Sequence, residues 1–330
     1  MRRRTSRLLA APLALATLLA ATACAAPADD DAAAGAETRT VTTDQGDVEV
    51  PVEPLRVVLL NFALAGYLYD LDVPVTTVTP EAADTDGTFS EFWADDAEAQ
   101  GTEFMTWTSD GFDLQAILDA DPDLIVAGGI GFPLFQAVEA YDQLSDIAPT
   151  VVVSGERTTW QEQLEFLAVD VFDQPDVYEE ALATYDERVA EVAGAIDVPD
   201  GESAFLSITS DGAPYVLIED QGLPTVFSAL GFTPAPLFAT GDFEPYTAGG
   251  DSFELSTEQV GQYVDQESVF VVGFNGAPVD VETLAENPVY AALPAFADDQ
   301  AYQLPYYVYR GDFDETLALL DFVEDTFATP

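Results

Sequence analysis

The sequence predicts an α/β protein built from two doubly wound lobes that a single long helix joins. Apolar runs of the kind buried in parallel sheets alternate with helical segments on both sides of a central stretch. That central stretch, from Asp176 to Ile196, is the longest helical pattern in the chain. At about 1.5 Å per residue it spans about 30 Å, which is long enough to run from one lobe to the other.

The connecting helix is predicted from apolar residues that fall three or four positions apart and form one stripe. These residues are Tyr178, Ala181, Leu182, Tyr185, Val189, Val192 and Ile196. Asp176 follows Pro175 and suits the N-cap, and the acidic Glu179 and Glu180 suit the positive end of the helix dipole.

The first lobe is predicted from strands that alternate with helices. We expect a hairpin at Thr40–Val50, strands at Pro54–Asn61, Val73–Val78, Asp123–Gly129 and Thr150–Ser154, and helices at Phe62–Leu71, Phe112–Leu118 and Leu134–Leu144. The second lobe repeats the pattern. We expect strands at Ser203–Ser210, Tyr215–Ile218, Glu267–Phe274 and Ala301–Tyr307, and helices at Leu223–Gly231, Thr257–Val264, Val289–Leu293 and Asp314–Phe327.

The N-terminus reads as a secretory signal, because arginines precede a short apolar run and small residues. Ala21-Thr22-Ala23-Cys24 resembles a bacterial lipobox, so we expect Cys24 to be lipidated; ordinary signal-peptidase cleavage is the alternative. The predicted organisation is a signal peptide at 1–23, a flexible tether at 24–38, the first lobe at 39–172, the connecting helix at 173–198 and the second lobe at 199–330.

The charge is strongly negative, with 9 basic residues against 61 acidic ones and no histidine. Four of the arginines precede Cys24, so the mature chain carries a net charge of −56. Nucleic acid is therefore not an expected partner. The simplest interpretation is a solvated acidic surface suited to high salt.

The missing residue types exclude most catalytic machinery. Without histidine or lysine, the chain has no Ser–His–Asp triad, Schiff-base lysine, Walker loop or histidine-based metal site. We therefore expect a protein that is not an enzyme and holds no intrinsic cofactor or metal. A hydrolase based on carboxylates remains a distant alternative.

Several segments, in order and spacing, resemble the helical-backbone class of solute-binding proteins that serve ABC importers of ferric siderophores and cobalamin. They include VPVEPLRVVLLN, FDLQAILDADPDLIVAGG, YDQLSDIAPTVVV, PTVFSALGFTP and NPVYAALPAFADDQAYQL. The resemblance implies a monomeric lipoprotein on the outer face of the cytoplasmic membrane that binds a ligand in a largely pre-formed cleft and delivers it to an ABC permease. Members present one glutamate on each lobe to the permease, but this chain has Gln115 and Ser228 there, so no docking pair is assigned.

Candidate ligand contacts lie where strands end, because ligands of open α/β sheets bind at the carboxyl ends of the strands. The candidates are Trp93, Trp107, Phe132, Arg157, Trp160, Tyr215, Tyr246, Phe274, Tyr307 and Arg310, with Asn61, Phe62, Ser210, Asn275, Tyr306 and Tyr309 beside them. Aromatic walls with a few arginines suit a bulky metal chelate. Arg56 and Arg188 are expected in ion pairs, and Asp121 and Asp123 in a surface turn.

The expected ligand is a ferric siderophore, and the acidic surface favours a neutral or cationic hydroxamate complex over an anionic catecholate. Cobalamin and haem are alternatives within the same fold, and an accessory surface lipoprotein without a transport role is another. Direct binding of iron by Tyr306 and Tyr307 is disfavoured, because adjacent residues of a continuing strand point to opposite faces.

Overall fold

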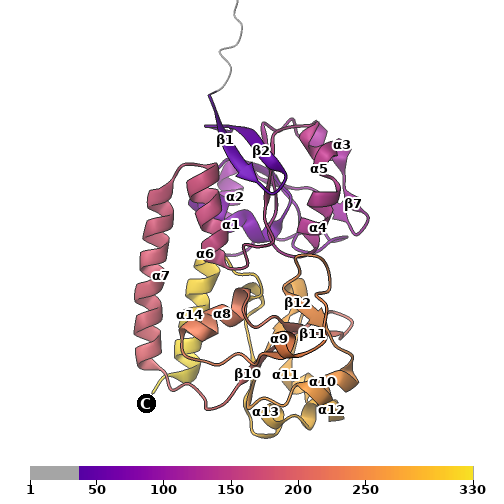
Figure 1. The fold of residues 1–330 in the computed structure, drawn as a ribbon, viewed down its shortest axis with the longest axis vertical. Coiled ribbons are helices and arrows are strands. Elements are labelled where there is room, and N and C mark those ends of the chain that lie inside the picture. The colour runs from indigo at the N-terminus through magenta and orange to yellow at the C-terminus, as the bar shows by residue number, and fades with distance from the viewer. Residues whose placement is uncertain (1–36, 330) are drawn as a thin grey trace, which may run out of the picture. The chain divides into compact units, whose positions relative to one another are not determined.

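The computed structural model describes residues 37–329, and its core consists of two five-stranded sheets (Figure 1). The first sheet has the order β5-β4-β3-β8-β9, and all its strands are parallel. They are β3 (Val57–Leu59), β4 (Val75–Val78), β5 (Glu103–Phe104), β8 (Leu124–Gly128) and β9 (Thr150–Val153). Every residue of β3, β8 and β9 is buried, as the uninterrupted apolar runs predict.

The second sheet has the order β12-β11-β10-β13-β14 and is mixed. Its strands are β10 (Ser203–Ile208), β11 (Pro214–Leu217), β12 (Ser252–Glu254), β13 (Ser268–Gly273) and β14 (Ala301–Gln303). Strands β10, β13 and β14 run parallel, whereas β11 and β12 add an antiparallel edge. We call the halves built on the two sheets the first and the second lobe. The predicted class, two α/β lobes with one long helix between them, is confirmed.

Two small hairpins accompany the first lobe. Strands β1 (Thr38–Thr43) and β2 (Gly46–Pro51) form the hairpin predicted at Thr40–Val50, and β6 (Trp107–Thr108) pairs with β7 (Gly111–Phe112). The helical elements of this lobe are η1 (Phe62–Leu64), α1 (Ala65–Asp70), α2 (Ala94–Gln100), α3 (Leu114–Asp119), α4 (Phe132–Glu139) and α5 (Tyr141–Ser145). The prediction of a single helix at Leu134–Leu144 is wrong, because the helix is interrupted at Ala140, between α4 and α5.

The segment between the lobes contains α6 (Trp160–Glu165), a π-helical turn η2 (Phe166–Val171) and α7 (Pro175–Ala195). Helix α7 confirms the long helix expected from Asp176 to Ile196. The predicted N-cap at Asp176 is wrong, because the N-cap is Gln174 and Asp176 lies within the first turn. It runs beside the C-terminal helix α14 (Phe313–Phe327), as Figure 1 shows in rose and yellow. Arg188 of α7 forms ion pairs with Asp321 and Glu324 of α14, so one arginine ties the two helices together.

The remaining helices belong to the second lobe. They are α8 (Gly222–Ala229), α9 (Leu237–Thr240), α10 (Thr257–Tyr263), η3 (Phe274–Gly276), α11 (Val281–Leu284), α12 (Pro288–Ala291), α13 (Pro294–Ala297) and η4 (Tyr306–Val308). The last strand was predicted to reach Tyr307, which is wrong. Strand β14 ends at Gln303, and Pro305 leads into the 3₁₀ turn η4, where the rings of Tyr306 and Tyr307 meet edge to face at 5.5 Å.

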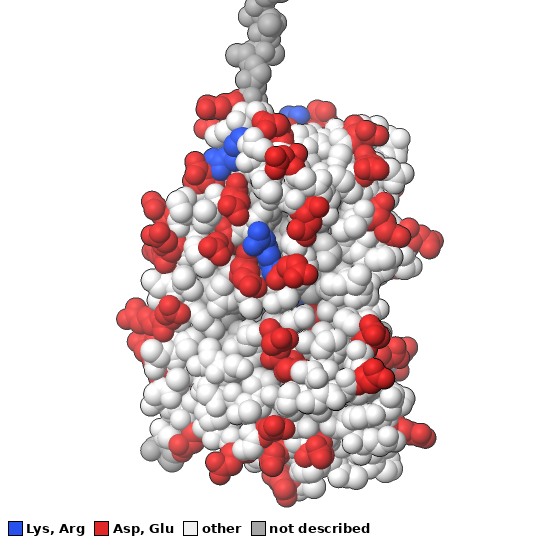
Figure 2. Space-filling view, viewed as in Figure 1, with Lys and Arg blue, Asp and Glu red and all other residues white. Residues whose placement is uncertain are grey.

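Acidic side chains are spread over the face seen in Figure 2, with few basic ones between them. The prediction that Arg56 and Arg188 each form ion pairs is confirmed. Arg56 pairs with Asp121, and Arg188 pairs with Asp321 and Glu324 of α14. Within residues 37–329, no helix is long and apolar enough to cross a membrane. Cys24, the predicted signal and most of the predicted tether lie outside the described residues.

Candidate functional site

A groove opens between the two lobes at the carboxyl ends of β4 and β13. Its walls come from Phe62, Glu81 and the loop 85–90 on the first lobe, and from Asn275, Gly276 and Tyr306 on the second. The groove has a volume of about 460 Å³, which lies within the range of sites that bind small molecules. The sequence rule that places ligands beyond strand ends therefore agrees with the position of the groove.

The inner end of the groove is narrower and is lined by more charged side chains. It shares its outer residues with the open part and continues inward to a further set of side chains: Asn61, Trp93, Pro133, Tyr307, Arg310, Asp312 and Glu315. Asn61 is fixed there because its amide donates to the carbonyl of Gly128, at 2.6 Å, and its oxygen caps η1.

Aromatic rings form the wall on the first lobe. Trp93 packs against Phe62 at 4.9 Å, Tyr69 at 5.3 Å and Phe89 at 5.5 Å between ring centroids. Across the groove, Tyr307 meets Phe92 edge to face at 4.8 Å. Packing against several neighbours fixes these rings, so the wall is rigid before any ligand arrives.

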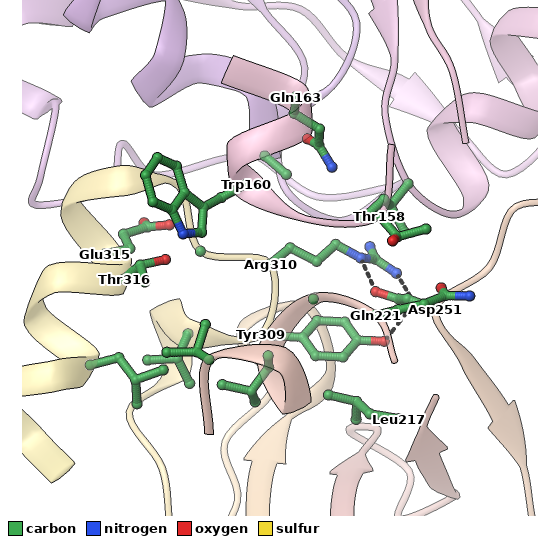
Figure 3. A pocket seen from close by; sticks show the side chains of 18 of the residues that line it. Thr158, Trp160, Gln163, Leu217, Gln221, Asp251, Tyr309, Arg310, Glu315 and Thr316 are labelled. Carbon is green, nitrogen blue, oxygen red and sulfur yellow. Dashed lines mark hydrogen bonds and ion pairs between the residues drawn. The ribbon is translucent and has the colours of Figure 1, made fainter. Parts of the chain in front are cut away.

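Arg310 lies at the inner end of the groove and is already paired. Its Nε donates to Asp251 Oδ2 at 2.8 Å and its Nη2 to Asp251 Oδ1 at 3.0 Å, a two-point ion pair between largely buried side chains (Figure 3). Nη2 also donates to the hydroxyl of Tyr246 at 2.9 Å, and Nη1 to Asn275 at 3.4 Å. The guanidinium stands over the ring of Tyr309 at 4.7 Å. Arg310 is the one arginine among the described residues that lines the groove, and Asp251 neutralises its charge.

A small cavity lies behind Arg310, on the side of the connecting segment (Figure 3). Trp160, Gln163, Tyr309, Arg310, Glu315 and Thr316 contribute to its lining, together with aliphatic side chains of α8 and α14. Trp160 is 5% exposed, and its Nε1 has no hydrogen-bond partner among the described residues. Arg310 and Glu315 thus separate this cavity from the groove.

The lobes meet closely along glycines. The amide of Gly131 donates to the carbonyl of Gly249 at 2.9 Å. A Cβ at Gly131 would lie 2.2 Å from the Tyr246 hydroxyl and 2.8 Å from Arg310 Nη2, and the φ of Gly131 is +82°. Only glycine fits this position, because both the contact and the backbone conformation exclude a side chain.

Of the ten predicted contacts, Trp93, Tyr307 and Arg310 line the inner end of the groove, and Trp160 lines the small cavity. Tyr246 and Phe274 contact Arg310, and Tyr215 packs against both at 6.0 and 5.3 Å between ring centroids.

The other three predicted contacts lie elsewhere. Trp107 is buried, donates its Nε1 proton to the carbonyl of Pro80 and lies 6.0 Å from the ring of Phe132. Arg157 stands over the ring of Phe166 at 4.3 Å and is not among the side chains that line the groove or the cavity.

The carboxyl groups of the groove were not among the predicted contacts. Glu81 follows β4, so the strand-end rule would have found it had it been applied to that strand. Asp312 and Glu315 form the capping box of α14, and this helix begins before the predicted start at Asp314. Asp251 directly precedes β12, a strand that was not predicted. Burial raises the pKa of Glu81, and the nearby charge of Arg310 partly opposes this. Burial also raises the pKa of Glu315, and the neighbouring carboxyl group of Asp312 raises it further.

This architecture, with two α/β lobes, one long connecting helix and a groove between the lobes, defines a class of solute-binding protein. A model of the periplasmic binding protein family matches residues 57–308, so the chain belongs to that family. The family is one of binding proteins, and the chain is accordingly a binding protein and not an enzyme.

Three relatives illustrate the match. The chain is 26% identical to the ferric enterobactin-binding periplasmic protein FepB of Escherichia coli O6:H1 over 88% of this chain and 91% of that protein. It is 28% identical to the iron(3+)-hydroxamate-binding protein FhuD of Bacillus subtilis over 64% of each chain. The crystal structure of holo-ViuP has the same fold, with a TM-score of 0.74, 22% identity and coverage of 88% of this chain and 95% of that one.

Proposed function

We propose that this chain captures a ferric siderophore outside the cytoplasm, in the groove between its lobes, and delivers it to an ABC permease. The groove has the size and the rigid aromatic wall that a bulky metal chelate requires. Relatives named for binding iron chelates, FepB and FhuD, support the same ligand class. The ferric ion is cargo within the chelate, so the chain itself needs no metal ligands.

We further propose that the preferred chelate is a neutral or cationic hydroxamate complex. The observation that carries this proposal is the charge of the groove, where Glu81 and Asp86 are lining residues and Asp251 neutralises Arg310. An anionic catecholate would enter a field of its own sign, whereas a cationic complex would be attracted. The relatives include binders of both chelate types by name, so they do not decide between them.

Competition between two chelates of opposite charge tests this preference. We expect cationic ferrioxamine B to bind the full chain more tightly than anionic ferric enterobactin, and its affinity to fall as salt rises. Glu81→Gln should weaken ferrioxamine B by about three- to tenfold, since one nearby charge is lost. The matched control is Glu98→Gln, an exposed glutamate of α2. Tighter binding of enterobactin, or of cobalamin or haem, would contradict the preference.

We also propose that the chain is exported and anchored through a lipid on Cys24, which places the groove on the outer face of the cytoplasmic membrane. The support is the apolar signal followed by the only cysteine of the sequence. Palmitate labelling of cells should mark the chain, and Cys24→Ala should abolish the label and release the protein from the membrane. Unchanged labelling or membrane retention in that variant would exclude this anchor.

A further inference from the structure

Two carboxyl groups are buried where the lobes meet at the inner end of the groove. Glu315, in the first turn of α14, accepts a hydrogen bond from the hydroxyl of Ser90 at 2.9 Å. Ser90 belongs to the first-lobe loop that also lines the open groove. Glu315 is 8% exposed and Ser90 is 4% exposed, so this contact between the lobes is largely shielded from water.

Asp312 is the second carboxyl group, and it is 3% exposed. It caps α14: its Oδ1 accepts from the amide of Glu315 at 3.0 Å, and Glu315 Oε2 accepts from the amide of Asp312 at 3.2 Å. Its other oxygen packs against Gly66 of α1, where an added Cβ would lie 1.7 Å away. Both acids of the pair therefore contact the first lobe directly.

The surroundings of the pair are predominantly acidic or neutral. The titratable groups that face it are Tyr67 and Asp70 on α1, Glu81 after β4, Glu91 and Asp96 beside and on α2, Tyr306 and Tyr307 on η4, and Asp314 on α14. The nearby cation, Arg310, is paired with Asp251. Burial raises the pKa of both Asp312 and Glu315, and the carboxyl neighbours add to this effect.

We propose that closing the lobes over the groove is coupled to the uptake of one proton by the pair Asp312 and Glu315, so that the chain holds its ligand more tightly at lower pH. This inference rests on the proposed function, since it concerns the ligand groove itself. The pair acts as a pH-sensitive latch between Ser90 on one lobe and α14 on the other.

The direction of the effect follows from linkage. In the closed form the two carboxyl groups hold a proton, because burial disfavours their charged forms and because two adjacent buried negative charges repel each other. When the lobes separate, both carboxyl groups reach water and return to ordinary acidic pKa values. Closure therefore binds a proton between the ordinary carboxyl pKa and the raised pKa, and the affinity for ligand falls as pH rises through that window.

The test measures the dissociation constant of ferrioxamine B, whose own charge is constant across the range, from about pH 5.5 to about pH 8.5. For the full chain we expect affinity to fall by about ten- to thirtyfold, because uptake of one proton changes affinity by up to about tenfold per pH unit and the window ends near the raised pKa of Asp312, about 7. The variant that combines Asp312→Asn with Glu315→Gln removes both carboxyl groups and hence the proton equilibrium of the pair. The new amide at position 315 can still accept from the backbone amide of residue 312 through its oxygen, and it can donate to Ser90 Oγ through its nitrogen. The affinity of this double variant should stay at the tight level throughout the range. Asp325→Asn, an exposed acid on the same helix, is the control and should behave as the parent chain.

A ligand-free measurement separates this inference from the proposed function. Trp93 and Trp160 line the spaces on either side of Glu315, so tryptophan fluorescence of the free chain should titrate with pH. The part of this titration that the pair contributes should be lost from the double variant Asp312→Asn with Glu315→Gln, and the full titration should persist in Asp325→Asn. If no chelate binds while this difference remains, the proposed function fails and the latch stands. If chelate binds and the parent chain and the double variant Asp312→Asn with Glu315→Gln share the same pH profile in both measurements, the latch is wrong.

Discussion

Arg310 and Asp251 form a two-point ion pair at the junction of the lobes, with distances of 2.8 and 3.0 Å. Their side chains are 13% and 7% exposed. Removing one partner of a buried pair leaves the other charge without compensation, which costs about 3–5 kcal/mol. We therefore expect Arg310→Met to lower the free energy of unfolding by about that amount, as measured by urea denaturation.

The matched comparison is Arg56→Met, which breaks a pair whose side chains are 43% and 89% exposed. Exposed pairs contribute less than about 1 kcal/mol, so this variant should unfold nearly as the parent does. Equal losses in the two variants would contradict the structural role given to the Arg310 pair.

The link between α7 and α14 gives a second prediction. Arg188 pairs with Asp321 and Glu324 on the neighbouring helix, and its side chain is 24% exposed. Arg188→Met should destabilise the fold by about 1 kcal/mol, because the network is partly solvated. The loss should shrink at high salt, where screening weakens the parent's pairs. A loss that is independent of salt would point to packing of the side chain instead.

Gly131 provides a test of how closely the lobes approach. Gly131→Ala places a methyl group against Tyr246 and Arg310 at a φ of +82°, so the lobes must separate or the backbone must strain. We expect destabilisation of about 1–3 kcal/mol together with at least tenfold weaker binding of chelate. The control is Gly194→Ala on α7, where an added Cβ meets nothing within 4 Å, and this change should be neutral or stabilising.

The excess of acidic residues predicts a dependence of stability on salt. With 61 acidic residues against 9 basic ones in the whole chain, self-repulsion destabilises the folded state at low ionic strength. The melting temperature should rise from low salt to about 1 M NaCl, because salt screens that repulsion. A flat or falling melting temperature would show that the charge is better compensated than the sequence implies.

Much of the fold could be predicted from hydrophobic patterns. Uninterrupted apolar runs located β3, β8, β9 and β13, and a stripe of apolar residues located α7, because burial imposes these periodicities on the sequence. Short elements were missed. Strand β12 has three residues, and its pairing with β11 depends on tertiary contacts that local sequence does not encode.

The site was predicted less completely than the fold. Strand ends indicated the neighbourhood of Trp93, Tyr307 and Arg310, because topology brings such ends together. The pairing of Arg310 with Asp251 joins residues 59 positions apart, and no local pattern reveals it. The same holds for Ser90 and Glu315, which are 225 positions apart and lie on different lobes.

The measurement that tests the account most directly is a fluorescence titration of the full chain with ferrioxamine B and with its iron-free form. Trp93 lines the inner end of the groove and packs against Phe62 on its wall, so a bound ferric chelate should quench its emission. We expect saturable quenching at micromolar concentrations or below by the ferric complex alone. The quenching should be lost from Trp93→Phe while calorimetry still detects binding. Absence of binding by ferric hydroxamate, ferric catecholate and ferric carboxylate chelates alike would contradict the claim that the groove captures a siderophore.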